Sequence, residues 1–421
     1  MHVINVDMRN SPFFIILAGL MLLLDLYVFQ IIKLVSNSSG SRVRAIIFFS
    51  YWTVSVIALL ILFLLPLFEN IPKASRSILF SIVIGIFLGK LIASIFFLVD
   101  DIRRATQWLA AKLLFRNTEG EEIQDSGKIT RSVFLSWLGL AFGGTLFSTL
   151  LYGFSNKYNY EIKKIKLSFS NLPDSFKGLK IVQLSDIHSG SFTDIKAVEK
   201  GVKEVQSLKP DIILFTGDLV NNTADEMDFY QKVFNQLSAP MGVYSILGNH
   251  DYGDYYKWPS LEAKQKNLDA LKGVHEAMGW SLLLDEHVLL EKNEEKIALI
   301  GIQNWSALKR FPKYGNLKKA YQGAEHIPFK ILMSHDPTHW DAEVRPDYSD
   351  IDLMLSGHTH GMQFGIEIPG FKWSPVQYVY KQWMGLYEEG NQKLYVNSGY
   401  GFIGYPGRVG ILPEITLIEL S

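Results

Sequence analysis

Hydrophobic residues follow two different patterns along this 421-residue chain. Up to about Tyr152 they form long apolar runs, whereas from about Tyr158 onward they form short runs that end in polar turns and alternate with helical stretches. The first pattern is typical of membrane helices and the second of a globular α/β domain. We therefore expect a transmembrane helical domain at residues 1–156 and a second domain at residues 157–421.

Four apolar segments are long enough to cross a hydrocarbon layer roughly 30 Å thick, which takes about 20 helical residues. They are residues 13–35, 43–68, 78–99 and 133–154. The fourth is the weakest because it contains Gly139, Gly143 and Gly144, although small residues are common where membrane helices pack closely. Three spans are therefore the alternative to four. A cleaved signal peptide is disfavoured, because the first apolar run is long and lacks an Ala-x-Ala-like site.

Two charged residues lie inside the predicted spans, Asp25 in the first and Lys90 in the third. These spans cross in the same direction, so both charges lie at a similar depth. A mutual ion pair would reduce the cost of placing them in the membrane. An ion or proton path is the functional alternative to such a structural pair.

Lysine and arginine near the membrane ends predict the orientation, because they favour the cytoplasmic side. One side carries Lys33, Arg42, Arg44, Arg103, Arg104, Lys112, Arg116, Lys128 and Arg131. The other carries Arg9, Lys73, Arg76, Lys157, Lys163, Lys164 and Lys166. The bias is modest, and it predicts a multi-pass inner-membrane protein with both termini and the second domain outside the cytoplasm. Residues 102–115 have the spacing of an amphipathic helix on the inner surface.

Strand-like and helix-like segments alternate in the second domain. The predicted strands are residues 180–184, 211–215, 243–247, 331–333 and 351–355, and the predicted helices are residues 194–208 and 226–237. This alternation indicates an α/β fold, in which functional groups collect beyond the carboxyl ends of the strands.

Each predicted strand is followed within a few residues by histidine, aspartate or asparagine. These residues are Asp186, His188, Asp218, Asn249, His250, His335, His358 and His360. One such histidine alone would be an ordinary structural residue, but repetition at five strand ends predicts a common site. A set of oxygen and imidazole groups suits Mn²⁺, Fe or Zn²⁺. The set exceeds the needs of one ion, whereas two adjacent ions sharing a carboxylate would use nearly all of it.

Composition excludes some functions. Lysine plus arginine number 41 and aspartate plus glutamate 42, which gives a formal net charge of −1. No strongly basic face or tail stands out, so we expect no nucleic-acid partner. The chain has no cysteine, which excludes disulfides and thiolate ligands but leaves the compartment and the oligomeric state open.

Five ordered motifs in the second domain resemble those of a known family, the calcineurin-like metallophosphoesterases. They are Asp186-x-His188, Gly217-Asp218, Gly248-Asn249-His250-Asp251, Ser334-His335 and Gly357-His358-Thr359-His360. The resemblance covers about residues 180–420. Its last part, with Asn397-Ser398-Gly399, Arg408 and Glu414, is similar to the membrane-associated bacterial branch. It implies a four-layer αββα sandwich, in which two mixed sheets face each other and helices lie outside.

The resemblance also implies a centre of two divalent ions, Mn, Fe or Zn. One ion would be held by Asp186, His188, Asp218 and His360, and the second by Asp218, Asn249, His335 and His358. Asp218 would bridge the ions together with a hydroxide that attacks the phosphorus. His250 would protonate the leaving group or contact the phosphoryl oxygen, and Asp251 would brace the turn.

One position departs from the family's phosphoprotein phosphatases, which have an aspartate three residues after the bridging one. Here Asn221 stands there, followed by Asn222 in place of an arginine. An amide can hold the ring of His250 but cannot stabilise an imidazolium by charge. This argues against a phosphoprotein phosphatase.

Aromatic residues near the motifs bear on the substrate. The insert between Asp251 and Ile297 begins with Tyr252, Tyr255, Tyr256 and Trp258 and is a candidate cap, and a second aromatic group lies at residues 364–387. Aromatic side chains with polar tips suit a membrane interface, and packing within the protein is the alternative. Tyr252, Trp258 and Arg408 are the candidate substrate-binding residues.

We therefore expect a membrane-anchored phosphoesterase that hydrolyses a phosphodiester or a phosphomonoester, with a lipid-linked or cell-envelope substrate favoured. One alternative is hydrolysis of soluble nucleotides. Another is a sensor module that binds a phosphorylated ligand without turnover.

Overall fold

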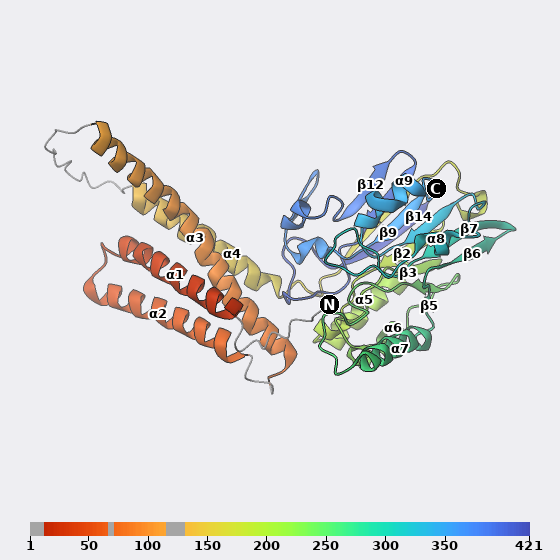
Figure 1. Cartoon of the computed structure of the whole chain (residues 1–421), viewed down its shortest axis with the longest axis horizontal. Coiled ribbons are helices and arrows are strands. Elements are labelled where there is room, and N and C mark those ends of the chain that lie inside the picture. Colours follow the sequence, from red (N-terminus) through yellow and green to blue (C-terminus); the bar gives the residue numbers. More distant parts are fainter. Residues whose placement is uncertain (1–11, 66–70, 115–130) are drawn as a thin grey trace. The chain divides into compact units, whose positions relative to one another are not determined.

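The computed structural model describes residues 12–65, 71–114 and 131–421 (Figure 1). The chain divides into two compact units, Met1–Tyr152 and Gly153–Ser421. The domain limits 1–156 and 157–421 stay a proposal.

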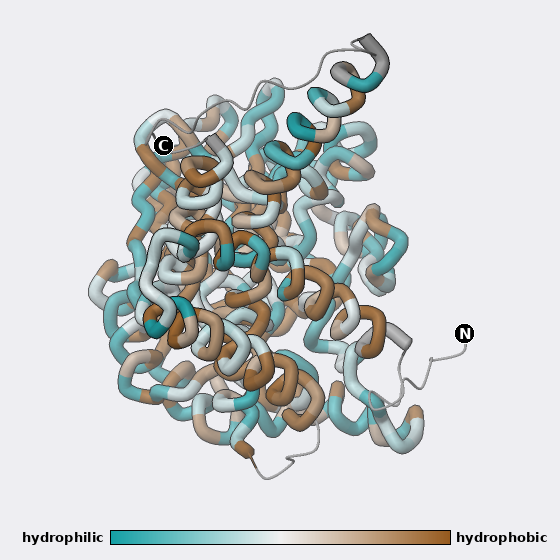
Figure 2. The backbone as a smooth tube through the Cα atoms, turned by 90° about the vertical axis from the view of Figure 1, so that its left-hand side faces the viewer, coloured by the Kyte–Doolittle hydropathy of each residue, from teal (hydrophilic) through white to brown (hydrophobic). Residues whose placement is uncertain are grey.

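Four helices make up the first unit. They are α1 (Pro12–Val35), α2 (Ser41–Leu64), α3 (Lys73–Leu114) and α4 (Arg131–Gly153). Each is long and apolar enough to cross a membrane, and hydrophobic residues recur along them (Figure 2). Large apolar side chains such as Phe49 and Phe134 are exposed, as expected where lipid would surround the helices. The expected membrane domain of four helices is confirmed, and the end of the second predicted span, residues 66–68, lies outside the described residues.

Helix α3 is longer than the predicted third span. We expected residues 102–115 to form an amphipathic helix on the inner surface. Residues 102–114 are helical, but they continue α3 (Lys73–Leu114) without a break, residue 115 lies outside the described residues, and the place of this helix on the inner surface stays a prediction. No glycine or proline interrupts the second half of this helix. Ion pairs one turn apart also support it, because Arg103 lies 2.8 Å from Asp100 and Arg104 lies 3.3 Å from Asp100.

Asp25 and Lys90 form the ion pair predicted within the membrane helices. Lys90 Nζ lies 2.5 Å from Asp25 Oδ1, and Ser55 Oγ donates a hydrogen bond to the same carboxylate at 2.9 Å. Asp25 is fully buried. A paired and hydrogen-bonded charge is the form in which an ionised side chain is tolerated at such a place.

Two six-stranded mixed sheets form the centre of the second unit. Across the sheet, the first contains β1 (Glu161–Leu167), β14 (Glu414–Leu420), β2 (Lys180–Leu184), β3 (Ile212–Phe215), β4 (Val243–Ser245) and β5 (Ser281–Leu282). The second contains β12 (Gly385–Glu389), β13 (Gln392–Val396), β9 (Leu353–Ser356), β8 (Lys330–Met333), β7 (Glu295–Gly301) and β6 (Glu286–Lys292). Strands β2 to β5 are parallel, as are β7, β8, β9 and β13.

The two sheets pack face to face through a buried apolar layer that includes Ile212 and Leu355. On the outer face of the first sheet lie α5 (Ile195–Ser207), α6 (Gln231–Phe234) and α7 (Leu261–Ala277). On the outer face of the second lie α8 (Leu317–Tyr321) and the turn Trp340–Val344, which leads into α9 (Arg345–Asp347). This confirms the predicted αββα sandwich.

Two predicted segments differ from the structure. The helix expected at residues 226–237 is reduced to the turn Ala224–Met227 and to α6, although Met227 and Phe234 still reach the core. The insert expected as a cap instead forms α7, β5 and β6 over most of its length. Its edge strands and its helix therefore belong to the sandwich itself, and only its start lies beside the site.

Candidate metal centre

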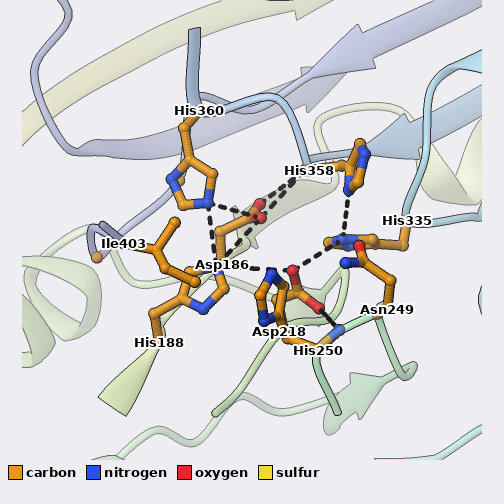
Figure 3. Close-up of polar contacts among 12 residues, drawn as sticks. Asp186, His188, Asp218, Asn249, His250, His335, His358, His360 and Ile403 are labelled. Atoms are coloured by element: carbon orange, nitrogen blue, oxygen red, sulfur yellow. Dashed lines mark hydrogen bonds and ion pairs between the residues drawn. The ribbon is translucent and has the colours of Figure 1, made fainter. Parts of the chain in front are cut away.

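The predicted site residues follow strand ends in both sheets. From the first sheet come Asp186 and His188 after β2, Asp218 after β3, and Asn249 and His250 after β4. From the second come His335 after β8, and His358 and His360 after β9. The loops that follow neighbouring parallel strands lie at the same edge of a sheet. Because the two sheets pack against each other, the site residues of both sheets lie close together (Figure 3). The structure thus unites all eight residues.

Several residues of the site have a left-handed backbone conformation. The five residues concerned, which have φ between 49° and 71°, are Asp186, His188, Asp218, His358 and His360. Residues other than glycine adopt this conformation at a cost, and they do so mainly where the surrounding structure holds them for function.

The first cluster consists of Asp186, His188 and His360, all of which are buried. His360 Nε2 lies 3.2 Å from Asp186 Oδ1, and the Nε2 atoms of His188 and His360 are 3.0 Å apart. One nitrogen or oxygen atom from each residue lies within 4.8 Å of the others. Such a group can hold a divalent ion.

The second cluster consists of Asp218, His335 and His358. His335 Nε2 lies 3.1 Å from Asp218 Oδ2 and 3.2 Å from His358 Nδ1. Asp218 Oδ2 also lies 3.6 Å from Nε2 of His188 in the first cluster. Asp218 therefore lies between the two clusters, and Figure 3 shows His188 and His360 on one side and His335 and His358 on the other.

Two glycines let the loops approach these carboxylates closely. A Cβ atom on Gly248 would lie 2.2 Å from Asp218 Oδ1, and one on Gly357 would lie 2.2 Å from Asp186 Oδ2. Any side chain would displace the carboxylate. Because Gly248 has no side chain, the backbone N–H of His250 can donate to Asp218 Oδ1 at 2.8 Å. Asp218 Oδ2 is then directed at the histidines.

Hydrogen bonds at the far side of each ring fix which nitrogen faces the site. His335 Nδ1 donates to the carbonyl oxygen of Thr216 at 2.8 Å, so its Nε2 faces Asp218. His358 is turned the other way, because its Nε2 lies 2.8 Å from Tyr380 Oη and 3.4 Å from Asp336 Oδ2. Partners of this kind orient histidine ligands around metals.

The ring of His250 is held in a way that the sequence did not predict. From the sequence, the side-chain amide of Asn221 could have held its orientation. Instead the backbone carbonyl of Asn221 accepts from His250 Nδ1 at 2.8 Å, while the amide Nδ2 donates to Ser191 Oγ at 3.0 Å. Nε2 of His250 is thereby left to the pocket that this residue lines.

Asp251 braces the turn, as predicted. Its Oδ2 accepts from the backbone N–H groups of Gly248 and Asp218, each at 2.9 Å, and its Oδ1 accepts from that of Leu219 at 2.8 Å. Burial, together with the charge of Asp218, raises the pKa of Asp251 to about 7. The carboxyl ties the loop after β4 to the loop after β3.

Charges in the site favour binding of a cation. Burial acts to raise the pKa of Asp218, but His335 and His250 outweigh it and hold that pKa well below its usual range. Burial lowers the pKa of His358 to about 4. Burial also acts to lower the pKa of His335, but Asp218 raises it to about 10. A cation would take the place of that proton, because a histidine ligand must be neutral.

The residues present fit a divalent metal. Among the described residues, Asn249 Oδ1 is a buried oxygen without a hydrogen-bond partner, although Nδ2 of the same amide donates to Tyr255 Oη at 3.0 Å. An unpaired buried acceptor needs a partner, and a metal ion beside the second cluster would supply one. The donors are oxygen and nitrogen atoms only, which suits Mn²⁺, Fe or Zn²⁺.

Tyr252 and Trp258 do not line the pocket over the clusters. Tyr252 is buried, donates to Gln303 Oε1 at 3.2 Å and stacks on Tyr314. Trp258 Nε1 donates to the carbonyl oxygen of Gly253 at 2.8 Å. These contacts hold the loop after β4, and direct substrate contact of Tyr252 and Trp258 stays a prediction.

Arg408 is also placed differently from our expectation. It is fully buried, its guanidinium donates to the carbonyl oxygens of Gly399 and Gly401, and Nη2 lies 3.3 Å from His360 Nδ1. Burial lowers its pKa to about 10. Arg408 therefore supports the back of the His360 ring, and contact with a substrate phosphate stays a prediction.

A pocket of about 390 Å³ opens over the metal clusters. Sequence reasoning missed Arg310 and Phe311 in its wall, because they lie in the loop after β7 and belong to no motif. Arg310 Nη2 donates to Tyr380 Oη at 3.3 Å, and the Phe311 ring packs against His358 with centroids 4.8 Å apart. Further apolar lining comes from Met362, Val376, Val379 and Ile403.

Comparisons with known proteins agree with this site. The family model described as "Calcineurin-like phosphoesterase" matches residues 179–362, and the one described as "Probable Calcineurin-like phosphoesterase, transmembrane domain" matches residues 8–157. The "Transmembrane protein with metallophosphoesterase domain" of Danio rerio is 31% identical over 320 residues, which cover 74% of this chain and 67% of that protein.

Two bacterial proteins are also similar. The "Uncharacterized metallophosphoesterase YkuE" of Bacillus subtilis (strain 168) is 29% identical over 304 residues, covering 70% of this chain and 98% of that protein. The "UDP-2,3-diacylglucosamine pyrophosphatase LpxG" of Chlamydia trachomatis is 28% identical over 282 residues, covering 55% of this chain and 81% of that protein.

The sandwich fold, the paired His and Asp clusters and the membrane helices define a metal-dependent phosphoesterase of the membrane. The chain belongs to the calcineurin-like metallophosphoesterases with a transmembrane domain.

Proposed function

We propose that this protein is a binuclear-metal phosphoesterase that hydrolyses a phosphodiester or phosphomonoester of a lipid-linked or cell-envelope molecule. The observation that supports it most is the position of Asp218. Its Oδ2 lies 3.1 Å from Nε2 of His335 in one cluster and 3.6 Å from Nε2 of His188 in the other. A carboxylate placed in this way can serve two ions at once.

The two clusters support the proposed ligand sets. The first ion would bind Asp186, His188, Asp218 and His360, and the second would bind Asp218, Asn249, His335 and His358. When bound, two divalent ions would acidify a water molecule and neutralise the charge that develops on the phosphoryl group. The protein would orient each histidine ring so that the nitrogen available to bind a metal faces the site.

His250 is the proposed proton donor. With Nδ1 donating to the Asn221 carbonyl, the doubly protonated ring can donate its Nε2 proton to a phosphoryl or leaving-group oxygen in the pocket. Transfer of that proton to the leaving oxygen would release the product as an alcohol.

A lipid-linked substrate is supported by the pocket lining. Met362, Val376, Val379 and Ile403 give it an apolar side, and Arg310 gives it a cation beside the clusters. This combination suits a phosphate ester that carries an acyl or prenyl group. LpxG of Chlamydia trachomatis, which is similar to this chain, is named for a substrate that carries two acyl groups. We further propose that the domain acts outside the cytoplasm at the inner membrane, on the evidence of the lysine and arginine distribution.

Hydrolysis of bis-p-nitrophenyl phosphate and p-nitrophenyl phosphate by the purified full-length protein tests this proposal. We expect Mn²⁺ to support activity and Asp218→Asn to abolish it, whereas the exposed control Asp269→Asn should retain it. If the wild type is inert with Mn²⁺, Fe²⁺ and Zn²⁺, or if Asp218→Asn is equally active, the proposal is wrong.

A further inference from the structure

A small hairpin follows the last metal motif and pairs with neither six-stranded sheet. It consists of β10 (Ile366–Ile368) and β11 (Phe371–Trp373), joined at Pro369 and Gly370. Across the two strands, Ile366 pairs with Trp373, Ile368 with Phe371, and Glu367 with Lys372. Successive side chains in a strand point to opposite faces. The hairpin therefore has one apolar face and one charged face.

The charged face is the one attached to the domain. Glu367 forms an ion pair with Lys163 at 2.5 Å. Lys372 Nζ donates to the carbonyl oxygen of Met384 at 2.5 Å and lies over the ring of Trp383. These contacts determine which side of the hairpin is turned away from the domain.

The apolar face is exposed, which is the reverse of the usual arrangement in a half-buried strand. Ile368 is 57% and Phe371 is 53% exposed, and Ile366 is exposed as well. Removing such side chains from water would be favourable. The turn is also well defined, since proline followed by a glycine with φ of 80° is the signature of a type II turn. A contiguous exposed apolar face of this kind marks an interaction surface.

This face continues to the rim of the pocket. Trp373 Nε1 donates to Tyr378 Oη at 3.5 Å, and Tyr378 is 77% exposed. Val379, the next residue, and Met362 are both exposed and both line the pocket over the clusters. We call this set the hairpin surface, and its members are Met362, Ile366, Ile368, Phe371, Tyr378 and Val379.

We propose that the hairpin surface inserts into the interfacial layer of the lipid bilayer. The four apolar helices of the same chain hold this domain at a membrane. Tryptophan and tyrosine at the edge of an apolar surface suit the level of lipid headgroups.

The same contact gives a route for the substrate, and this second part rests on the proposed function. An acyl-bearing phosphate ester leaves the bilayer along the hairpin surface and reaches the clusters past Met362 and Val379. Its apolar part then stays against apolar side chains while the phosphate moves to the ions.

Site-specific labelling tests the lipid contact in the full-length protein, because the chain has no cysteine of its own. Ile368→Cys and Phe371→Cys are labelled with bimane in vesicles of phosphatidylcholine and phosphatidylglycerol with brominated acyl chains. We expect strong quenching at both positions. Phe229→Cys is the matched control, since Phe229 is a 78% exposed aromatic of the same unit outside the hairpin surface. Quenching at 368 and 371 no greater than at 229 would overturn the proposal.

Kinetics test the substrate route separately. The double variant Ile368→Ser and Phe371→Ser should raise KM about tenfold for a diacyl phosphodiester in vesicles, which corresponds to about 1.4 kcal/mol, and should hydrolyse soluble bis-p-nitrophenyl phosphate like the wild type. Equal KM values for the vesicle substrate would refute the route. A wild type inactive on both substrates would instead refute the proposed function, while the quenching still decides the lipid contact.

Discussion

The backbone carbonyl of Asn221 accepts a hydrogen bond from Nδ1 of His250 at 2.8 Å. A carbonyl can only accept, so this bond fixes the proton on Nδ1 and leaves Nε2 to the pocket. Because the contact is made by the main chain, the identity of residue 221 does not determine the orientation of the ring. Mutations at positions 221, 249 and 250 should therefore have three different outcomes.

Asn249→Ala and His250→Ala should separate metal binding from proton transfer. His250→Ala should keep both metals and lower kcat by about 10² to 10⁴, which is the usual contribution of a positioned acid. Asn249→Ala should bind less metal, since it removes the unpaired buried oxygen beside the second cluster. Metal content by mass spectrometry, measured together with kcat, checks both. Loss of a metal in His250→Ala would contradict this division of roles.

Asn221→Ala should change kcat little. The substitution removes the bond to Ser191 but keeps the carbonyl that holds His250. Steady-state kinetics on a soluble phosphodiester provide the measurement, with His250→Ala as the inactive reference. A fall as large as that of the reference would mean that the amide side chain acts on the ring after all.

Asp336→Asn should weaken metal binding. Asp336 Oδ2 lies 3.4 Å from His358 Nε2 and has no hydrogen-bond partner within the part of the chain that the structure describes, so it is placed to orient this histidine and raise its basicity. Removing such a partner typically lowers metal affinity by about 10- to 100-fold. Titration of the metal-free protein with Mn²⁺ measures the effect. Asparagine keeps the oxygen that accepts from Thr338, so a lowered affinity could not be explained by loss of the turn, and an unchanged affinity would contradict the prediction.

Removal of metal should destabilise the second unit. Each cluster draws on both sheets, since Asp186 of the first sheet meets His360 of the second and Asp218 of the first meets His335 of the second. Ions that bind only the folded chain stabilise it by mass action. Chelation with EDTA should lower the unfolding temperature of the wild type and change that of Asp218→Asn much less. Calorimetry in detergent tests this, and equal shifts would contradict it.

His275 should make the second unit sensitive to acid. Burial lowers its pKa to about 3, below the ordinary value of 6.5, and its Nδ1 faces Ser245 Oγ at 3.0 Å. Between these two values the unfolded chain binds a proton that the folded chain does not, so stability falls as pH falls from 6.5 toward 3, by about 1.4 kcal/mol per pH unit.

His275→Phe keeps a ring in the core and removes the titration. Its unfolding free energy should therefore depend less on pH in this range than that of the wild type, whatever its absolute stability. The exposed His326→Phe is the control and should keep the wild-type slope. Identical slopes in all three proteins would show that His275 does not carry the effect.

Much of the site could be predicted from the sequence, because one pattern, an apolar strand followed by a potential metal ligand, is repeated along the chain. Asp186, Asp218, Asn249, His335 and His358 each follow an apolar strand, and parallel strands bring their ends together whatever the lengths of the loops. The membrane helices could also be predicted, because the length and hydropathy of a segment are enough to identify it as a membrane span.

Other features depend on contacts that no local pattern contains. Arg310 and Phe311 reach the pocket through the path of a loop after β7. Arg408 looks like a phosphate ligand in the sequence, but three-dimensional packing places it behind His360. The direction in which the hairpin turns its apolar face is set by the ion pair of Glu367 with Lys163, which are about 200 residues apart.

Helix α3, with 42 residues in one uninterrupted run, is roughly 63 Å long at a rise of 1.5 Å per residue. That is about twice the hydrocarbon thickness of a bilayer, so at the tilts usual for membrane helices part of α3 would lie outside the hydrocarbon layer. Helices tilt when the bilayer thins. For the same change in tilt, the far end of a helix of this length would move further than the end of a helix that only spans the bilayer.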